Sequence, residues 1–341
     1  MKSVLVDEGI GHSMIKYINN ADISFGLTVT SSESAEETAS ASDNATFIFS
    51  LINFLNLDSY VEFEVYISII WNVILFIMLL KTKDSLTMFQ TIFWAVSIVV
   101  LNIFDFCLAK EPIQMLFFIL ISIIIMSNIK SEKTKWILCF LVLLLSALTF
   151  RTYYVIIAMF MVFVTVLFDC YISKKQKITL KNIIFILIGI CLFYFVFLNI
   201  AKVISPDNYQ ELIRVRLRTS SAASDLRALF MSENLFIFSI DYVITIVRML
   251  FPVELLRLGV KYFPYVIYQA IISFILIKNI MNYKNLDNKK KLALYIFIAF
   301  LMGSATFEPD FGSWVRHEAV AFPIIAIISG CFKEKNILKK D

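Results

Sequence analysis

Acidic, basic and aromatic residues gather in one short stretch of an otherwise apolar part of the chain. Residues 307–318 read FEPDFGSWVRHE and separate the apolar runs 292–306 and 319–332. Histidine titrates near neutral pH and carboxylates exchange protons, so this stretch can support acid–base catalysis. The alternative is a purely structural turn. The predicted catalytic residues are His317, Glu308, Asp310 and Glu318.

The elements that position this stretch must lie in a membrane, because the composition is too apolar for a soluble domain. The chain is 59% hydrophobic, contains 33 phenylalanines and has a mean hydropathy of +0.80. Its five cysteines are scattered without a CxxC pair and read as core residues. It holds no GxGxxG, Walker-type loop or HExxH motif, so nucleotide hydrolysis and zinc chemistry have no support, and we expect no metal and no nucleic-acid partner.

The apolar runs predict an all-α polytopic membrane protein with about nine or ten transmembrane helices. The candidate spans are 62–80, 86–106, 112–129, 136–150, 152–172, 182–204, 262–280, 292–306 and 319–332. Several are short, which predicts thinned or broken helices facing a polar cavity. Residues 205–261 mix apolar and charged positions and predict interfacial helices or a re-entrant pair.

Three regions follow from this pattern. Residues 1–61 form a polar N-terminal segment, residues 62–332 a transmembrane domain with the large outer loop 205–261, and residues 333–341 a basic tail. Within the first region, 31–46 is acidic and rich in small residues, which suits a loop.

Lysines and arginines separate along this topology. Eighteen of the 23 lysines fall in alternate connectors and in the tail, which the positive-inside rule places in the cytoplasm. All eight arginines then fall on the outer face, and so does the stretch 307–318. The planar fork of arginine binds phosphate bidentately, so the arginine set predicts an anionic ligand outside the membrane. Contacts with lipid headgroups are the alternative.

An outer N-terminal segment needs a way across the membrane. With nine spans and a cytoplasmic tail, residues 1–60 must lie outside, yet no signal peptide precedes them. Either a first helix upstream of Met1 is missing, which we favour, or the tail crosses without one.

Four further groups of polar residues lie on the predicted outer face, each with a structural alternative. Acids and a histidine near the N-terminus can serve as a base or coordinate a divalent ion, or form a solvated tail. The connector before residue 112 can bind substrate or only begin a helix. Arg151 can line a polar cavity or mark a helix boundary. The alternating arginines after residue 213 can clamp a phosphate or rest on headgroups. These candidates are Asp7, Glu8, His12, Lys110, Glu111, Arg151, Tyr153, Arg214, Arg216 and Arg218.

Four of these motifs carry a family resemblance. The segment FEPDFGSWVRHEAVAFPI, the KEP connector, the R-x-Y-Y boundary and the DEGIGH start resemble bacterial Wzy-type and EpsG-type polysaccharide polymerases. The resemblance covers most of the chain in layout and about 30 residues in motif. The architecture is also similar to that of GT-C membrane glycosyltransferases, which place a catalytic acid in the first outer loop. DEGIGH fits that slot, but this chain lacks the helix before it.

The resemblance implies an enzyme in the bacterial cytoplasmic membrane. It would join undecaprenyl-diphosphate-linked oligosaccharide repeat units of a surface polysaccharide on the outer side, without a nucleotide sugar or other cofactor. A flippase and a chain-length regulator are the implied protein partners. Arg151, Arg316 and the group at 214–218 would hold the diphosphate, and Trp314 and outer tyrosines such as Tyr153 would stack on sugars.

Two other functions stay open. A GT-C glycosyltransferase would use a polyprenyl-phosphate sugar donor, with Asp7 or Glu8 as base. A lipid-linked oligosaccharide flippase would transport without chemistry. Transporters of this kind often show internal repeats and midplane charges, and neither is visible in this sequence.

Overall fold

The structure is a computed structural model. It describes residues 48–55, 57, 59–82, 86–106, 111–149, 151–175, 178–217, 224–226, 228–230, 232–308 and 310–332. The described secondary structure is helical, apart from isolated bridges, so the prediction of an all-α protein is confirmed. The chain divides into two compact units: unit 1 is Met1–Val155 with Ala319–Asp341, and unit 2 is Ile156–Glu318.

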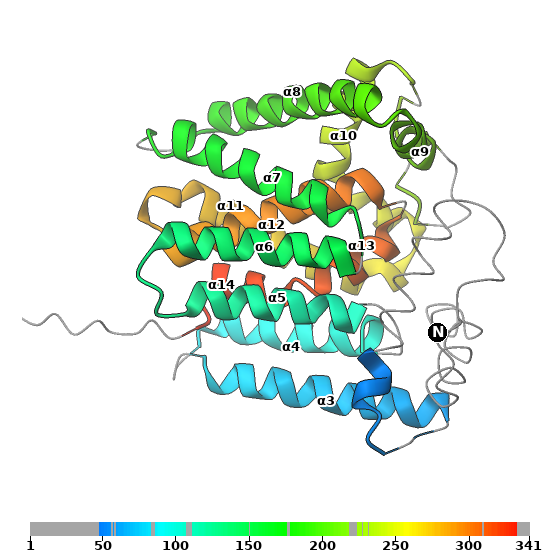
Figure 1. The fold of residues 1–341 in the computed structure, drawn as a ribbon, viewed down its shortest axis with the longest axis vertical. Helices are drawn as coiled ribbons and strands as arrows, with labels where there is room; N and C mark the ends of the chain where they lie inside the picture. The colour runs from blue at the N-terminus through cyan, green and yellow to red at the C-terminus, as the bar shows by residue number, and fades with distance from the viewer. Residues whose placement is uncertain are drawn as a thin grey trace, which may run out of the picture. The chain divides into compact units, whose positions relative to one another are not determined.

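A short helical segment at residues 48–52 precedes the main helices in the described part of unit 1. The main helices are α3 (Tyr60–Leu80), α4 (Met88–Phe104), α5 (Glu111–Met126), α6 (Glu132–Thr149) and α14 (Phe322–Ile328). Figure 1 shows α3 to α6 in order across the unit. The α4 N-terminus carries a capping box of Thr87 and Gln90, and the Gln90 amide also donates to the carbonyls of Ser329 (2.9 Å) and Gly330 (3.1 Å). One glutamine thus ties the end of the chain to α4.

Unit 2 holds the remaining helices. They are α7 (Tyr154–Leu167) with the π-helix η2 (Phe168–Ile172), α8 (Leu180–Ile204), α9 (Pro206–Leu217), α10 (Leu235–Leu250), the 3-10 turns η3 (Val253–Leu258), η4 (Val260–Tyr262) and η5 (Tyr283–Asn285), α11 (Phe263–Met281), α12 (Asn288–Phe307) and α13 (Phe311–Ala319). Inside this unit α10 packs against α8, α11 and α12. The Tyr194 and Tyr242 rings stack 3.6 Å apart between α8 and α10, and the Tyr242 hydroxyl donates to the Met302 carbonyl (2.7 Å).

Helix α12 is the central helix of unit 2. Within the protein, 83% of its apolar stretch is buried, against 22% for α8. A helix that is apolar all round suits such a position, because no face of it needs water. Gly303 lets α7 approach closely, since a Cβ there would clash with Cγ1 of Ile157 and lie 3.2 Å from its Cδ1.

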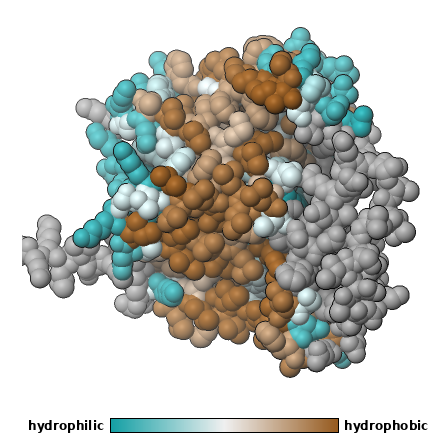
Figure 2. All heavy atoms as spheres, viewed as in Figure 1, coloured by the Kyte–Doolittle hydropathy of each residue, from teal (hydrophilic) through white to brown (hydrophobic). Residues whose placement is uncertain are grey.

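Among the residues that the structure describes, five helices are long and apolar enough to cross a membrane, and a sixth span is possible if the broken pair α13 and α14 counts as one. Helices α4 and α5 have 17 and 16 residues. At 1.5 Å per residue they fall slightly short of the roughly 30 Å hydrocarbon core. On the face shown in Figure 2, apolar residues cover the middle of the helices, while polar residues gather mainly toward their left-hand ends. The polytopic class is supported, and the count of nine or ten spans stays a prediction.

The predicted span 319–332 is wrong as a continuous helix. Ala319 is the last residue of α13, and after a break at residues 320–321 only Phe322–Ile328 is helical, with Pro323 in its first turn. Gly330 ends it in the left-handed region (φ 75°), with Cys331 N bonded to Ala326 O (3.1 Å) and Gly330 N to Ile327 O (2.9 Å). These two hydrogen bonds form a Schellman motif, which ends a helix at a glycine with positive φ. Apolar content alone did not reveal the stop.

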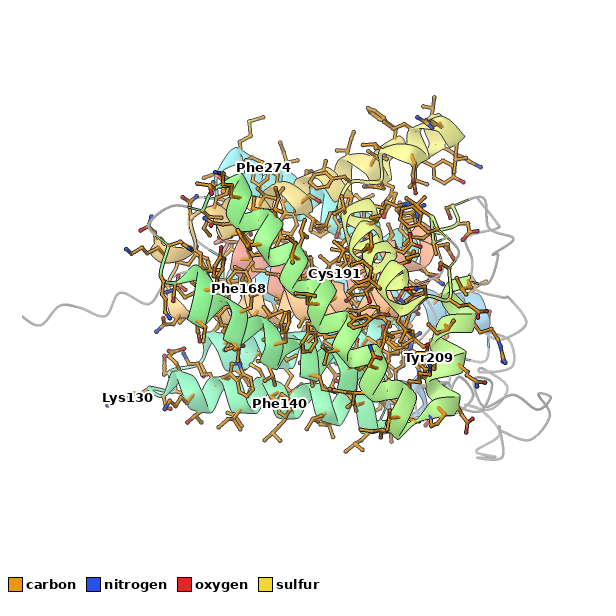
Figure 3. All side chains as sticks on the ribbon, turned by 90° about the horizontal axis from the view of Figure 1, so that it is seen from above. Lys130, Phe140, Phe168, Cys191, Tyr209 and Phe274 are labelled. Atoms are coloured by element: carbon orange, nitrogen blue, oxygen red, sulfur yellow. The ribbon has the colours of Figure 1, made fainter. Side chains whose placement is uncertain are left out.

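The lysine-rich connectors and the stretch 307–318 lie at opposite ends of unit 2, because α12 runs from Asn288 to Phe307 between them. Hydroxyls of Tyr283 and Tyr295 donate to Asp169 (3.2 and 2.7 Å), so the lysine-rich connectors 173–181 and 282–291 share one end. At the other end Phe311 N donates to Ser224 O (2.9 Å), which brings loop 224–226 to α13. In Figure 3, Phe168 and Tyr209 mark these two ends. The lysine-rich connectors therefore lie at the end of this unit opposite to Arg316, whereas Lys202 near the end of α8 and Lys261 before α11 are away from the lysine-rich end.

The close approach at Gly303 gives a stability test. Gly303→Ala should lower the melting temperature, because overpacking costs about 1–3 kcal/mol and exceeds the gain of about 1 kcal/mol in helix propensity. Gly189→Ala in α8 is the matched control, since its Cβ would lie 3.8 Å from Leu167 Cδ1, an ordinary contact. Thermal unfolding of both purified variants in detergent checks this. Equal melting temperatures would refute the close packing of α12 on α7.

Candidate functional site

The stretch 307–318 folds as a helix end, a turn and a short helix. Glu308 caps α12 in an extended conformation (φ −72°, ψ 120°), as expected of a residue before proline. Helix α13 then begins at Phe311, with Asp310 before it. Asp310 accepts hydrogen bonds from Ser313 N (3.0 Å) and Ser313 Oγ (3.3 Å) and forms an isolated bridge with Asp225. Asp310 is therefore the N-cap of α13.

Glu308 and His317 form a buried pair. His317 Nδ1 and Glu308 Oε1 share a short hydrogen bond, and the two residues are only 7% and 4% exposed. A carboxylate bound at Nδ1 holds the proton on that nitrogen and fixes the ring, so Nε2 becomes the basic nitrogen. This arrangement can remove a proton from a hydroxyl and stabilise the imidazolium that results.

Glu318 lies four residues after Trp314, on the same face of α13 as that ring. It is fully buried, and its Oε1 accepts from Gln269 Nε2 (3.0 Å). Among the described residues, no lysine or arginine forms an ion pair with it. Burying a lone carboxylate is costly, so this position is rarely filled without a reason.

Several buried polar atoms of unit 2, one of them in Glu318 itself, are unsatisfied. Among the described residues of unit 2, the buried atoms without a hydrogen-bond partner include Gln269 Oε1, Glu318 Oε2, Tyr265 Oη, Trp314 Nε1 and Ser304 Oγ. Buried polar groups nearly always have a partner, and each exception needs an explanation. Bound water or polar groups of a ligand can supply the missing bonds. The interior next to Glu318 is thus suited to hold small polar groups.

Gln269 and Tyr265 were not among the sequence candidates. The Tyr265 ring packs against Phe311 with centroids 6.4 Å apart, which joins α11 to the start of α13. The sequence feature that could have identified this region is the polar amide side chain of Gln269 within the apolar helix α11. A polar residue within a membrane span is a functional-site hypothesis by default.

Trp314 is fully buried in unit 2, with its ring 6.1 Å from that of Phe300. Its stacking on a sugar face stays a prediction.

The arginines of unit 2 differ in their surroundings. Arg248 is held by Glu254 through hydrogen bonds from Nε (3.1 Å) and Nη2 (2.6 Å). Arg316 is half-buried beside His317, and Arg214 is exposed on α9, which packs against α8 and α12. The i and i+4 pairing of Arg214 with Arg218 stays a prediction, since Arg218 and the Arg216 side chain lie outside the described structure.

A second set of candidates lies in unit 1. Arg151 Nη1 donates to the Tyr153 hydroxyl (3.0 Å), and its guanidinium lies 5.6 Å from the Tyr153 ring centre. Glu111 begins α5 next to Pro112 and is buried. Tyr153 therefore orients the arginine at the break between α6 and α7. The predicted residues Asp7, Glu8, His12 and Lys110 lie outside the described residues.

The described residues contain no group of three or more His, Cys, Asp or Glu side chains that could hold a metal ion. Two surface grooves of about 420 Å³ lie elsewhere, one on α3 and one at the lysine-bearing end of unit 2.

Comparisons with known proteins give no assignment: no protein-family model, no curated protein and no solved structure matches this chain.

Substitutions of Asp310 can distinguish a helix-capping role of this residue from a catalytic role. Asn caps helices as well as Asp does, so Asp310→Asn should keep both stability and activity. Asp310→Ala should lose about 1 kcal/mol of stability. Thermal unfolding, together with glycosyl transfer by the purified variants in liposomes, checks this. Loss of activity in the Asn variant at unchanged stability would instead make the Asp310 charge part of the chemistry.

Proposed function

We propose that this chain is a membrane polymerase that joins undecaprenyl-diphosphate-linked oligosaccharide repeat units of a bacterial surface polysaccharide. The reaction is glycosyl transfer on the outer side of the bacterial cytoplasmic membrane. The observation that carries the proposal is the buried Glu308–His317 pair, a base and its orienting carboxylate at the arginine-bearing end of unit 2.

The pair supports a balanced reaction. His317 takes the proton from a hydroxyl of the acceptor sugar, and that oxygen attacks the anomeric carbon of the donor. The bond from this carbon to the diphosphate oxygen breaks, and undecaprenyl diphosphate leaves with the bonding electrons. Glu308 stabilises the imidazolium while the proton is held. Glu318, buried one residue further on, stays a further candidate for proton transfer.

The leaving group is a dianion or trianion, so it requires positive charge. In the proposal Arg316 contacts the diphosphate beside His317, and so do Arg214, Arg216 and Arg218 of the segment 214–218. Preorganised donors aimed at developing charge make one of the greatest contributions to enzymatic rate acceleration. Arg151, whose guanidinium donates to the Tyr153 hydroxyl, and the connector residues Lys110 and Glu111 belong to unit 1 and are proposed separately as substrate-binding residues.

The proposal includes nine or ten spans, an outward-facing polar cavity and interfacial helices within 205–261. The segregation of lysines and arginines in unit 2 and the unsatisfied polar atoms near Glu318 favour it. Lipid-linked oligosaccharide in the bilayer is the substrate. A flippase and a chain-length regulator are proposed protein partners, and no cofactor is required.

The product identifies the reaction class. A polymerase gives a ladder of repeats on lipid, a GT-C transferase adds one sugar, and a flippase moves its substrate without forming a bond. Purified protein in liposomes, supplied with a lipid-linked repeat unit, separates the three outcomes on one gel.

Variants of the pair test the mechanism. His317→Ala and Glu308→Gln should lower activity per membrane-inserted molecule about 10²–10³-fold, as does the loss of one preorganised group elsewhere. Arg316→Lys keeps the charge but loses the bidentate fork and should stay largely defective. Single lipid-linked repeat units should accumulate.

Glu254→Gln is the control, because Glu254 is a carboxylate already engaged by Arg248. Normal ladders from the His317→Ala protein, after correction for abundance, would remove the pair from the active site. A fall in abundance with proportional residual activity would mean a structural role.

Topology gives a second test of the proposal. In a cysteine-free background, single cysteines at Ser131 and Asn288 should resist a membrane-impermeant thiol reagent applied to intact cells. A cysteine at Ser313, which is partly exposed, should react. Labelling at Asn288 would place the lysine-bearing end outside and overturn the orientation.

A further inference from the structure

An apolar groove lies at the lysine-bearing end of unit 2, away from the Glu308–His317 pair. Its volume is about 420 Å³, and it is lined by Ile178, Phe274, Ile277, Lys278, Met281 and Asn282. Five of these residues come from the last two turns of α11 and the position after it, and Ile178 comes from the connector before α8. Phe274, labelled in Figure 3, is 54% exposed and Met281 is 53% exposed. The walls are apolar, and Lys278 and Asn282 supply the polar groups.

The groove borders the hydrocarbon on one side and a positive surface on the other. Helix α11 is one of the five candidate spans, so its exposed apolar face meets lipid chains. The segments 169–181 and 278–291 at this end hold nine lysines and only two aspartates.

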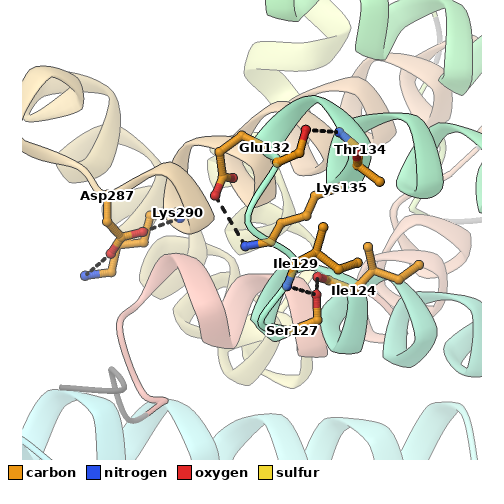
Figure 4. A network of polar contacts seen from close by, with 9 residues as sticks. Ile124, Ser127, Ile129, Glu132, Thr134, Lys135, Asp287 and Lys290 are labelled. Atoms are coloured by element: carbon orange, nitrogen blue, oxygen red, sulfur yellow. Dashed lines mark hydrogen bonds and ion pairs between the residues drawn. The ribbon is translucent and has the colours of Figure 1, made fainter. Parts of the chain in front are cut away.

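Both aspartates are already engaged. Asp169 accepts from the hydroxyls of Tyr283 and Tyr295. Burial raises the pKa of Tyr283 to about 12, so its phenol remains a donor at neutral pH. Asp287 caps α12 through Lys290 N (2.7 Å) and pairs with Lys290 Nζ (3.8 Å), as Figure 4 shows. Most of the lysine charge is therefore not neutralised by carboxylates of these two segments.

Two nearby lysines are also engaged, but with neutral rings. Lys175 Nζ lies 4.7 Å from the Tyr171 ring centre, and Lys291 Nζ lies 5.1 Å from that of Tyr283. Lys278 is exposed at the rim of the groove. An apolar trough with an ammonium at its rim is complementary to an acyl chain that carries a negative headgroup.

We propose that this groove binds an anionic phospholipid, with one acyl chain along Phe274, Ile277 and Met281 and the phosphate against Lys278. Basic pockets beside membrane helices recognise anionic headgroups in this way. A free phosphate ion would leave the apolar walls unoccupied, so lipid is the occupant that uses the whole groove. The inference does not depend on the chemistry proposed for the other end.

Native mass spectrometry of the full chain tests this, after extraction from nanodiscs that contain phosphatidylglycerol and phosphatidylcholine in equal amounts. The wild type should retain phosphatidylglycerol preferentially. Lys278→Gln should weaken that retention about fivefold, because one lysine near an anionic surface is worth about that factor. Ile277→Trp, which fills the groove, should abolish the retained molecule.

Lys284→Gln is the matched control, an exposed lysine at the same end that does not line the groove. Equal effects of Lys278→Gln and Lys284→Gln would overturn the site in favour of a diffuse basic surface. Displacement of the lipid by millimolar inorganic phosphate would overturn the acyl-chain contribution. Equal retention of both lipids by the wild type would overturn the headgroup preference.

Discussion

The burial of α12 is the constraint on which the rest of unit 2 depends. Its residues 292–306 are buried on all sides, so the helix can neither slide nor rotate without breaking contacts with α7, α9 and α10. Interiors packed at this density transmit displacement instead of absorbing it. The place where α12 ends is therefore fixed, and so is the carboxylate of Glu308 that caps it. The orientation of His317 follows from that one fixed end.

The polar groups of unit 2 depend on this apolar frame as well. In an interior without water, an unpaired charge or amide is costly, and each hydrogen bond between polar groups is correspondingly important. Tyr242 is satisfied by the Met302 carbonyl, and Glu308 by His317. Glu318 and Gln269 are satisfied only in part. The contrast separates groups that hold the fold from groups that have bonding capacity left for water or substrate.

The two ends of unit 2 are suited to different anions. One end carries arginines, an acid–base pair and a short helix capped by Asp310, which together suit a diphosphate at a reacting centre. The other carries lysines around an apolar groove, which suits the headgroup and chain of a structural lipid. The flexible ammonium group of lysine attracts a headgroup without fixing its position. The planar guanidinium group of arginine can bind a phosphate through two hydrogen bonds and so fix its orientation. Arginine therefore suits the proposed diphosphate, which must be held in a fixed orientation, and lysine suits the proposed lipid headgroup, which need not be.

The sequence by itself determined the apolar runs that form the helices, the segregation of lysine from arginine, and the stretch 307–318 as the place where chemistry is concentrated. The apolar run predicted a span ending at residue 306, close to the observed end of α12 at Phe307. Tertiary structure decided which polar residues meet: Glu308 with His317, Asp310 with Ser313, Glu318 with Gln269. It also decided that α12 is buried while α8 is largely exposed. The physical reason is that lipid tails and a protein core are equally apolar, so hydropathy marks a span but not its neighbours.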